Sequence, residues 1–344
     1  MTPLLDVQQV EVAFYTKDGV VRAVNGISYT LEKGDTLGIV GESGSGKSVS
    51  LLAMLGLIPT PPGKIMGGKI LYEGKDLLQL KRDQWSGIRG KQIAMIFQDP
   101  MTSLNPVMTI GNQIDEATIV NLGLTSKQAR QRTIEVLTQV GIPRAAERCN
   151  DFPHQFSGGM RQRVMIAMGI SCNPQLLIAD EPTTALDVTI QAQIIELVKR
   201  LQKQMGMTVI WVTHDLGVVA RLTKKIIVMY GGSIMESGPI KPIYARPKHP
   251  YTIGLLASVP GATINRSDEL HYIGGNPPDM IRLPAGCAFA PRCAYQTEQC
   301  LREKPGLIEV GKDHTAACWN LKTVEQNPVL AKSESRRAAG SQRG

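Results

Sequence analysis

The chain has 344 residues, of which 42% are apolar, and it carries a formal net charge of +8. This length predicts one large domain with an appendage, and the apolar content is sufficient for a globular core. No apolar run approaches the roughly 18 residues of a membrane span. Residues 1–6 lack the basic and apolar regions of a signal peptide, so we expect a cytoplasmic protein. Much of the positive charge lies in residues 331–344 and says little about the partners of the folded part.

The first predicted strands lead to a glycine-rich loop. Apolar and polar residues alternate over residues 4–14, a second strand is expected near residues 24–31, and an apolar run at 36–40 directly precedes the loop. The loop has the pattern G-x-x-x-x-G-K-[ST] between a strand and a predicted helix, which is the context of a phosphate-binding loop. Its residues are Gly41, Glu42, Ser43, Gly44, Ser45, Gly46, Lys47 and Ser48, followed by Val49 at the start of the helix.

This loop indicates a nucleoside triphosphate as the ligand. Its glycines let successive backbone N–H groups point at phosphate oxygens, and the N-terminus of the following helix adds a favourable dipole. Lys47 is predicted to reach the β- and γ-phosphates, and the Ser48 hydroxyl to bind Mg²⁺.

Three later apolar runs, at residues 93–97, 176–179 and 208–213, end in polar side chains. Helical periodicity lies between and around them, at residues 112–140 with a break at a glycine, at 157–170 and at 190–205. Alternation of strands and helices predicts an α/β fold with a mainly parallel sheet and its chemistry at the carboxyl ends of the strands.

The side chains at these strand ends suit phosphate hydrolysis. Asp180 is predicted to hold the Mg²⁺ shell, and Glu181 to act as general base or orienter for the attacking water. Gln98 and His214 would each be read as satisfied polar groups if they stood alone. In this order after the glycine loop, we interpret His214 as a hydrogen-bond partner of the γ-phosphate, and Gln98 as a contact to the metal and the water.

A further motif makes the order of these residues recognisable. Ser157, Gly158 and Gly159 open a predicted helix upstream of Asp180, and this stretch resembles the signature of ATP-binding-cassette (ABC) ATPases. Gln98 then matches the Q-loop, residues 184–187 with Asp187 match the D-loop, and His214 matches the switch histidine. The usual signature is Leu-Ser-Gly-Gly-Gln, whereas this chain has Phe156 and Met160 at its two ends.

The resemblance implies a P-loop NTPase of the ABC type that uses ATP and Mg²⁺. Its fold would have a mixed, mainly parallel core sheet, an N-terminal antiparallel β subdomain and a helical signature subdomain. In this family two cassettes pair head to tail, so Ser157 to Met160 would contact the ATP of the partner chain. An aromatic residue near the N-terminus would stack on adenine; Phe14 fits best and Tyr15 is the alternative.

A narrower resemblance concerns peptide importers. Residues 97–106, the His249-Pro250-Tyr251 element, and Gly286-Cys287 with Cys293 are similar to the dipeptide, oligopeptide and nickel branch of this family. The resemblance covers about residues 4–320 and implies an ATP-hydrolysing subunit that energises uptake of small peptides. It implies a second ATPase chain, identical or different, two membrane-spanning permeases contacted through about residues 99–114, and a periplasmic solute-binding protein. The expected location is the cytoplasmic face of a bacterial inner membrane, with no nucleic-acid partner.

The chain is predicted to have three parts. We expect a cassette at residues 1–240 with a helical subdomain at about 100–172, an extension at 241–322, and a disordered basic tail at 323–344.

Other functions have to be weighed against peptide import. Within the branch, a nickel complex or a heme precursor is an alternative solute. A soluble ABC ATPase acting on DNA or ribosomes usually has a long coiled coil or two cassettes, and neither is present. A redox or metal protein built on the cysteines would leave the ATPase motifs unexplained.

Four of the six cysteines cluster near the C-terminus: Cys287, Cys293, Cys300 and Cys318. Their spacing selects neither zinc nor an iron–sulfur cluster, and disulfides are disfavoured in the cytoplasm. Buried packing cysteines are the plain alternative, and Cys149 and Cys172 are expected to be such residues. The segment is loop-rich with little apparent apolar core, and a metal bound by the four thiolates could order such a segment. The resemblance favours a structural 4Fe–4S cluster, with zinc as the alternative.

Overall fold

The computed structural model describes residues 2–184, 186–258 and 273–325, in two compact units that are each discontinuous in sequence. Among the described residues, the first unit takes those within 2–6, 30–37 and 71–213, and the second those within 7–29, 38–70 and 214–325. Because these units interleave along the chain, they do not test the predicted linear division at residue 240. The tail predicted to be disordered comprises residues 323–344; its first three residues belong to a helix, and its remainder lies outside the described residues, as does the D-loop residue Ala185.

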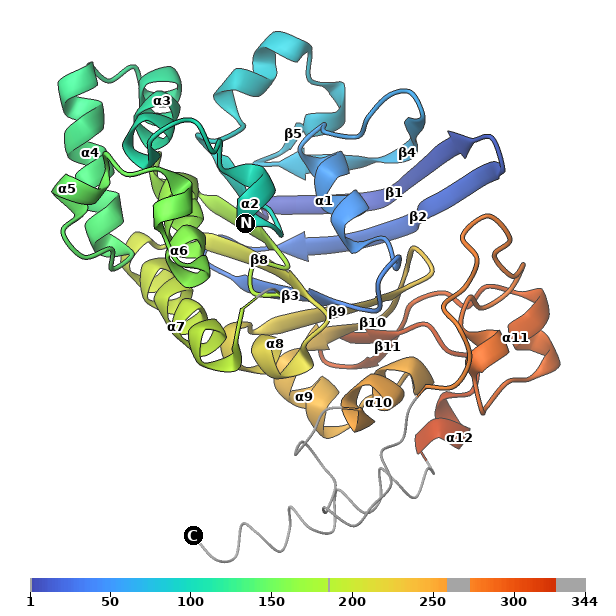
Figure 1. Ribbon diagram of the computed structural model, residues 1–344. Coiled ribbons are helices and arrows are strands. Elements are labelled where there is room, and N and C mark those ends of the chain that lie inside the picture. The colour runs from blue at the N-terminus through green and yellow to red at the C-terminus, as the bar shows by residue number, and fades with distance from the viewer. Residues whose placement is uncertain (1, 185, 259–272, 326–344) are drawn as a thin grey trace, which may run out of the picture. The chain divides into compact units, whose positions relative to one another are not determined.

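The helices and strands predicted from the sequence are present in their expected order, with shifted ends, and further elements that were not predicted accompany them (Figure 1). The strands are β1 (Leu5–Thr16), β2 (Gly19–Leu31), β3 (Thr36–Val40), β4 (Gly63–Tyr72), β5 (Lys75–Asp76), β6 (Ile93–Ile96), β7 (Leu176–Asp180), β8 (Thr208–Thr213), β9 (Lys225–Tyr230), β10 (Ser233–Pro239), β11 (Ile308–Gly311) and β12 (His314–Ala316). The helices are α1 (Lys47–Met54), α2 (Pro100–Ser103), α3 (Ile110–Leu122), α4 (Ser126–Gln139), α5 (Ala145–Arg148), α6 (Gly158–Ile170), α7 (Val188–Met205), α8 (Leu216–Leu222), α9 (Ile240–Ala245), α10 (Pro250–Ala257), α11 (Glu298–Arg302) and α12 (Leu321–Glu325). No helix of the described residues is long and apolar enough to cross a bilayer.

In the first unit, the strands that carry the catalytic candidates are parallel and buried. β8, β7 and β6 are neighbours in this order, and β7 lies parallel to both of the others. Every residue of β7 and β8 is buried, which explains why both are continuous apolar runs rather than alternating ones. The parallel sheet predicted from the sequence is confirmed here, and it brings the ends of β6 and β7 to one edge.

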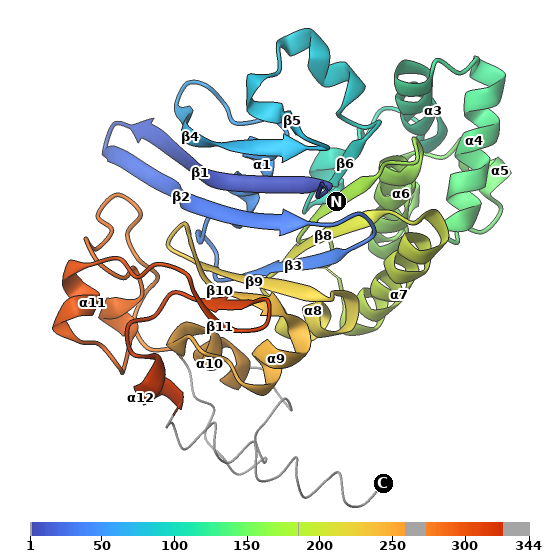
Figure 2. The ribbon, with the colours of Figure 1, turned by 180° about the vertical axis from the view of Figure 1, so that it is seen from behind.

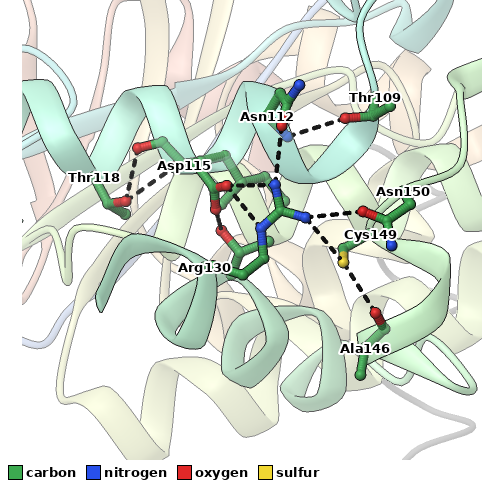
Figure 3. A network of polar contacts seen from close by, with 10 residues as sticks. Thr109, Asn112, Asp115, Thr118, Arg130, Ala146, Cys149 and Asn150 are labelled. Carbon is green, nitrogen blue, oxygen red and sulfur yellow. Dashed lines mark hydrogen bonds and ion pairs between the residues drawn. The ribbon is translucent and has the colours of Figure 1, made fainter. Parts of the chain in front are cut away.

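Helices α3 to α6 pack against one another in the first unit, and α6 also packs against β6 (Figure 1). The predicted break at Gly123 is confirmed, because this residue has φ +67° and ends α3. A polar network joins the helices: Arg130 on α4 forms an ion pair of 2.7 Å with Asp115 on α3 (Figure 3). Arg130 also donates to the Cys149 sulfur at 3.3 Å, so this buried cysteine takes part in the packing, as expected. Cys172 is buried as well.

The second unit contains the N-terminal strands, the glycine loop and the C-terminal extension. β2, β1 and β4 are neighbours in one sheet. In the other, β10 pairs antiparallel with β9 on one side and with β12 on the other, and β12 pairs with β11. Strand β12 therefore lies between β10 and β11, and Figure 2 shows α9 and α10 close to these strands. The extension therefore adds strands to the sheet rather than forming a detached tail.

The extension also has an apolar core, contrary to the sequence-based expectation. Phe289 lies 5.2 Å from the Tyr230 ring and 5.3 Å from the Tyr251 ring, centroid to centroid. Cys287 and Cys300 are buried in the same cluster. The prediction was wrong because these apolar side chains are scattered among prolines and glycines, without a helical or strand period. They form one cluster together with residues of β9 and α10.

Candidate ATP-binding site

The glycine loop connects β3 to α1 in the second unit, as its motif predicts. Gly46 has φ +96° and is the N-cap of α1, and a Cβ there would lie 2.3 Å from the Ala23 carbonyl oxygen. A Cβ at Gly41 would lie 2.2 Å from the Met229 carbonyl oxygen. Only glycine fits at these two positions, because the neighbouring backbone leaves no room for a side chain.

The polar groups of the loop fit a phosphate. The Lys47 side chain is folded onto the loop, where its Nζ donates to the carbonyl oxygens of Gly41 at 2.8 Å and Glu42 at 2.9 Å. Ser45 Oγ is buried and has no hydrogen-bond partner, which is unusual for a hydroxyl. The first N–H groups of α1 have no partner within the helix and carry the positive end of its dipole. A triphosphate would satisfy these donors.

The two aromatic candidates for adenine stacking differ in how far their side chains are exposed. The Phe14 ring is half-buried and packs at Gly63, where a Cβ would lie 2.9 Å from it. Tyr15 is half-exposed, and its hydroxyl contacts the Met66 sulfur at 3.5 Å. Neighbours in a strand point to opposite faces, so at most one of them faces a given ligand.

In the first unit, Asp180 and Glu181 end β7 as predicted. Asp180 is 7% exposed. Glu181 has φ +46°, in the left-handed region that costs a non-glycine residue about 1–2 kcal/mol. Its N–H donates to Val212 O at 2.9 Å, and its carboxylate accepts from the Thr184 hydroxyl at 2.9 Å. Such a strained and fixed carboxylate is typical of functional sites.

Most of the remaining first-unit candidates are exposed, whereas Gly159 and Met160 are half-buried. Gln98 lies two residues after the end of β6. Ser157 is the N-cap of α6 and accepts from the Met160 N–H, while Asp187 is the N-cap of α7. A Cβ at Gly159 would lie 2.7 Å from Ile190 on α7, so this glycine lets the two helices approach.

The site residues thus divide between the units. Gln98, Asp180, Glu181, the signature residues and Asp187 belong to the first unit. The glycine loop, Phe14 and His214 belong to the second, where His214 is exposed ahead of α8. The oxygen donors of Ser48, Gln98 and Asp180 are of the kind that Mg²⁺ prefers.

Two residues that contact the glycine loop were missed by the sequence reasoning. Tyr251 and Arg292, both in the extension, bind Glu42. Tyr251 was noted as part of the His-Pro-Tyr element, and Arg292 precedes Cys293, but neither pattern indicates a partner 209 or 250 residues away.

The four clustered cysteines line one narrow pocket together with Trp319. Burial raises the pKa of Cys293 to about 12 and that of Cys318 to about 11, which keeps both thiols protonated. No group of three or more His, Cys, Asp or Glu side chains in the described part of the chain could hold a metal ion. The structure therefore does not support the predicted metal site, although the four thiols share a pocket. Buried neutral thiols also pack as small hydrophobic groups.

Comparisons with known proteins agree with this description. Residues 24–184 match the family model "ABC transporter", and residues 235–300 match "Oligopeptide/dipeptide transporter, C-terminal region". The chain is 50% identical to the dipeptide transport ATP-binding protein DppD of Bacillus subtilis, over 96% of this chain and 98% of that protein. It is 50% identical to the oligopeptide transport ATP-binding protein OppD of the same organism, over 93% of this chain and 90% of that protein.

Solved structures give the same fold. The dimeric ATP-binding cassette MJ0796 bound to ADP and Pi matches with a TM-score of 0.62 and 27% identity, over 69% of this chain and 98% of that chain. The predicted ABC-type P-loop NTPase fold is confirmed by this match.

Proposed function

This chain belongs to the ABC transporter ATP-binding proteins of the oligopeptide and dipeptide branch, and we propose that it hydrolyses ATP to drive uptake of small peptides. The observation that carries the proposal is the glycine loop with its buried donors, Lys47 and Ser45, in a chain whose C-terminal region also matches the peptide-transporter model. Neither a nickel complex nor a heme precursor is favoured by any of these observations.

Each residue of the ATP site has a role in this proposal. Lys47 would leave the carbonyls of Gly41 and Glu42 to bind the β- and γ-phosphates, and Phe14 would stack on the adenine. Mg²⁺, held through Ser48, Gln98 and Asp180, would neutralise charge on the phosphate oxygens. Glu181 would orient and deprotonate the attacking water, and His214 would hydrogen-bond the γ-phosphate.

The proposed transporter needs further chains beside this one. Ser157, Gly158 and Asp187 are exposed, which suits a second cassette whose ATP they would contact. Phe97, Met101 and Val107, which follow β6, are exposed apolar side chains and suit a permease surface. We place the protein at the cytoplasmic face of a bacterial inner membrane, with two permeases and a periplasmic solute-binding protein that delivers the peptide.

The test is ATP-dependent peptide uptake by the reconstituted transporter. We expect uptake of labelled di- and oligopeptides with the wild-type chain and none with Lys47→Ala, because the β- and γ-phosphates would lose their cation. Uptake of a nickel complex in place of peptides would refute the peptide assignment and leave the ATPase assignment intact.

A 4Fe–4S cluster on Cys287, Cys293, Cys300 and Cys318, with zinc as the alternative, remains a separate proposal. It rests on the family resemblance and on the pocket shared by the four thiols. Anaerobic purification followed by iron, sulfide and zinc analysis tests it, with Cys293→Ser as the control. A folded, active protein free of iron and zinc would refute it.

A further inference from the structure

Glu42 of the glycine loop is held by two side chains of the C-terminal extension. Its carboxylate receives two hydrogen bonds from Arg292, at 2.6 Å from Nη1 and 3.1 Å from Nη2. Its backbone N–H donates to the Tyr251 hydroxyl at 2.9 Å. The Arg292 side chain is 6% exposed and that of Glu42 25%, so water screens the pair little. Parallel hydrogen bonds of this kind fix orientation as well as distance.

Arg292 is itself immobilised. Besides the two bonds to Glu42, it donates to Gly274 O at 2.8 Å, Ile273 O at 3.0 Å and the Tyr230 hydroxyl at 3.2 Å. All five N–H donors of the guanidinium therefore have partners. Burial alone would lower the pKa of Arg292, but its hydrogen bonds to Glu42 and Tyr230 outweigh burial and raise it. A fully bonded cation of this kind defines one position for the carboxylate.

Tyr251 is fixed by the rest of the His-Pro-Tyr element. Its N–H donates to His249 Nδ1 at 3.1 Å at the start of α10. The His249 N–H in turn donates to Glu236 on β10 at 2.9 Å, and His314 on β12 contacts the same carboxyl group at 2.7 Å. The backbone of Tyr251, whose hydroxyl accepts from Glu42, is thus connected through hydrogen bonds to two strands.

Glu42 also accepts hydrogen bonds from other residues of the glycine loop. Its carbonyl oxygen accepts from Lys47 Nζ at 2.9 Å and from the Ser45 N–H at 3.2 Å. The residue that the extension holds is therefore the one against which the phosphate-binding lysine rests. We propose that Arg292 and Tyr251 are positioning residues that hold the glycine loop in its phosphate-binding conformation through Glu42. This proposal rests on the proposed ATP binding and assigns to the extension a part in it.

The expected effect follows from populations. If the competent loop conformation falls to a tenth or a hundredth of its population, the apparent Kd for ATP rises by about 10- to 100-fold. Saturating ATP restores that conformation, so kcat of the assembled transporter should change much less than its KM for ATP. A residue with only a structural role would instead lower the folded fraction and leave Kd and KM unchanged.

The experiment measures ATP affinity of the full-length chain by titration, and KM and kcat of the assembled transporter. We expect Kd to rise by about 10- to 100-fold for Arg292→Met and Glu42→Gln, and by less for Tyr251→Phe, which keeps its ring packing. The double variant Arg292→Met with Glu42→Gln should bind ATP no more weakly than the worse single variant, since the two substitutions remove the same interaction. Arg302→Met is the matched control, because Arg302 pairs with Glu298 on the surface of the same extension; it should leave Kd unchanged.

The outcomes separate the two proposals. Absence of ATP binding by the wild-type chain would refute the proposed function. Wild-type affinity in folded Tyr251→Phe and Arg292→Met, or strictly additive losses in the double variant, would refute only the positioning role. A rise in KM with kcat retained, together with non-additivity, supports it.

Discussion

Protonation of His249 should make the stability of the second unit depend on pH. This side chain is 1% exposed, and burial lowers its pKa to about 4 from 6.5. The folded state therefore binds fewer protons than the unfolded state between these values, and stability present above pH 6.5 is lost as pH falls toward 4. At pH 5 the loss from this group is about 2 kcal/mol, from 1.36 kcal/mol per pKa unit over 1.5 units.

The assay is denaturant unfolding of the full chain at pH 7 and pH 5, for the wild type and for His249→Asn. Asparagine still offers an oxygen to the Tyr251 N–H at the helix start but does not titrate. Glu236 and His314, which contact the same network, are unchanged in the variant. We expect the wild type to lose about 2 kcal/mol more than the variant between the two pH values. Equal losses would refute the reasoning.

Three further predictions concern the ATP site. Glu181→Gln should retain ATP binding and slow turnover by about 10²- to 10⁴-fold; near-wild-type ATPase rates of the assembled transporter would contradict the assignment. Gly46→Ala should abolish ATP binding because its Cβ would meet the Ala23 carbonyl. Gly34→Ala, with φ +78° and open space around it, is the control that carries only the conformational cost. Ser157→Arg should leave nucleotide binding by its own chain intact yet block nucleotide-dependent dimerisation; full hydrolysis by a strict monomer would exclude the shared site.

The sequence predicted the parts of the fold that local patterns encode. The glycine loop between β3 and α1 and the carboxylates at the end of β7 follow from short motifs and continuous apolar runs. The ends of elements were less well predicted: β2 begins at Gly19 rather than near Val24, because its first residues alternate only weakly in polarity.

Long-range contacts were not predictable in this way. The pairing of Arg292 with Glu42 joins residues 250 positions apart, and no periodicity relates them. The same holds for the aromatic cluster of Tyr230, Tyr251 and Phe289, whose members look like isolated aromatic residues in loops. Their burial depends on the order of the strands in the sheet, which no local sequence pattern encodes.

The pairing of β12 with β10 has a consequence for shortened forms of this protein. Glu236 and Ser237 of β10 lie opposite Ala316 and Thr315, and the Ala317 N–H donates to Met235 O at 2.8 Å. A chain cut after α10 would leave this side of β10 with open hydrogen-bonding groups, which recruit strands from other molecules. It would also remove His314, which contacts the buried carboxyl group of Glu236. Truncation after α10 should thus give an aggregating protein rather than a minimal ATPase.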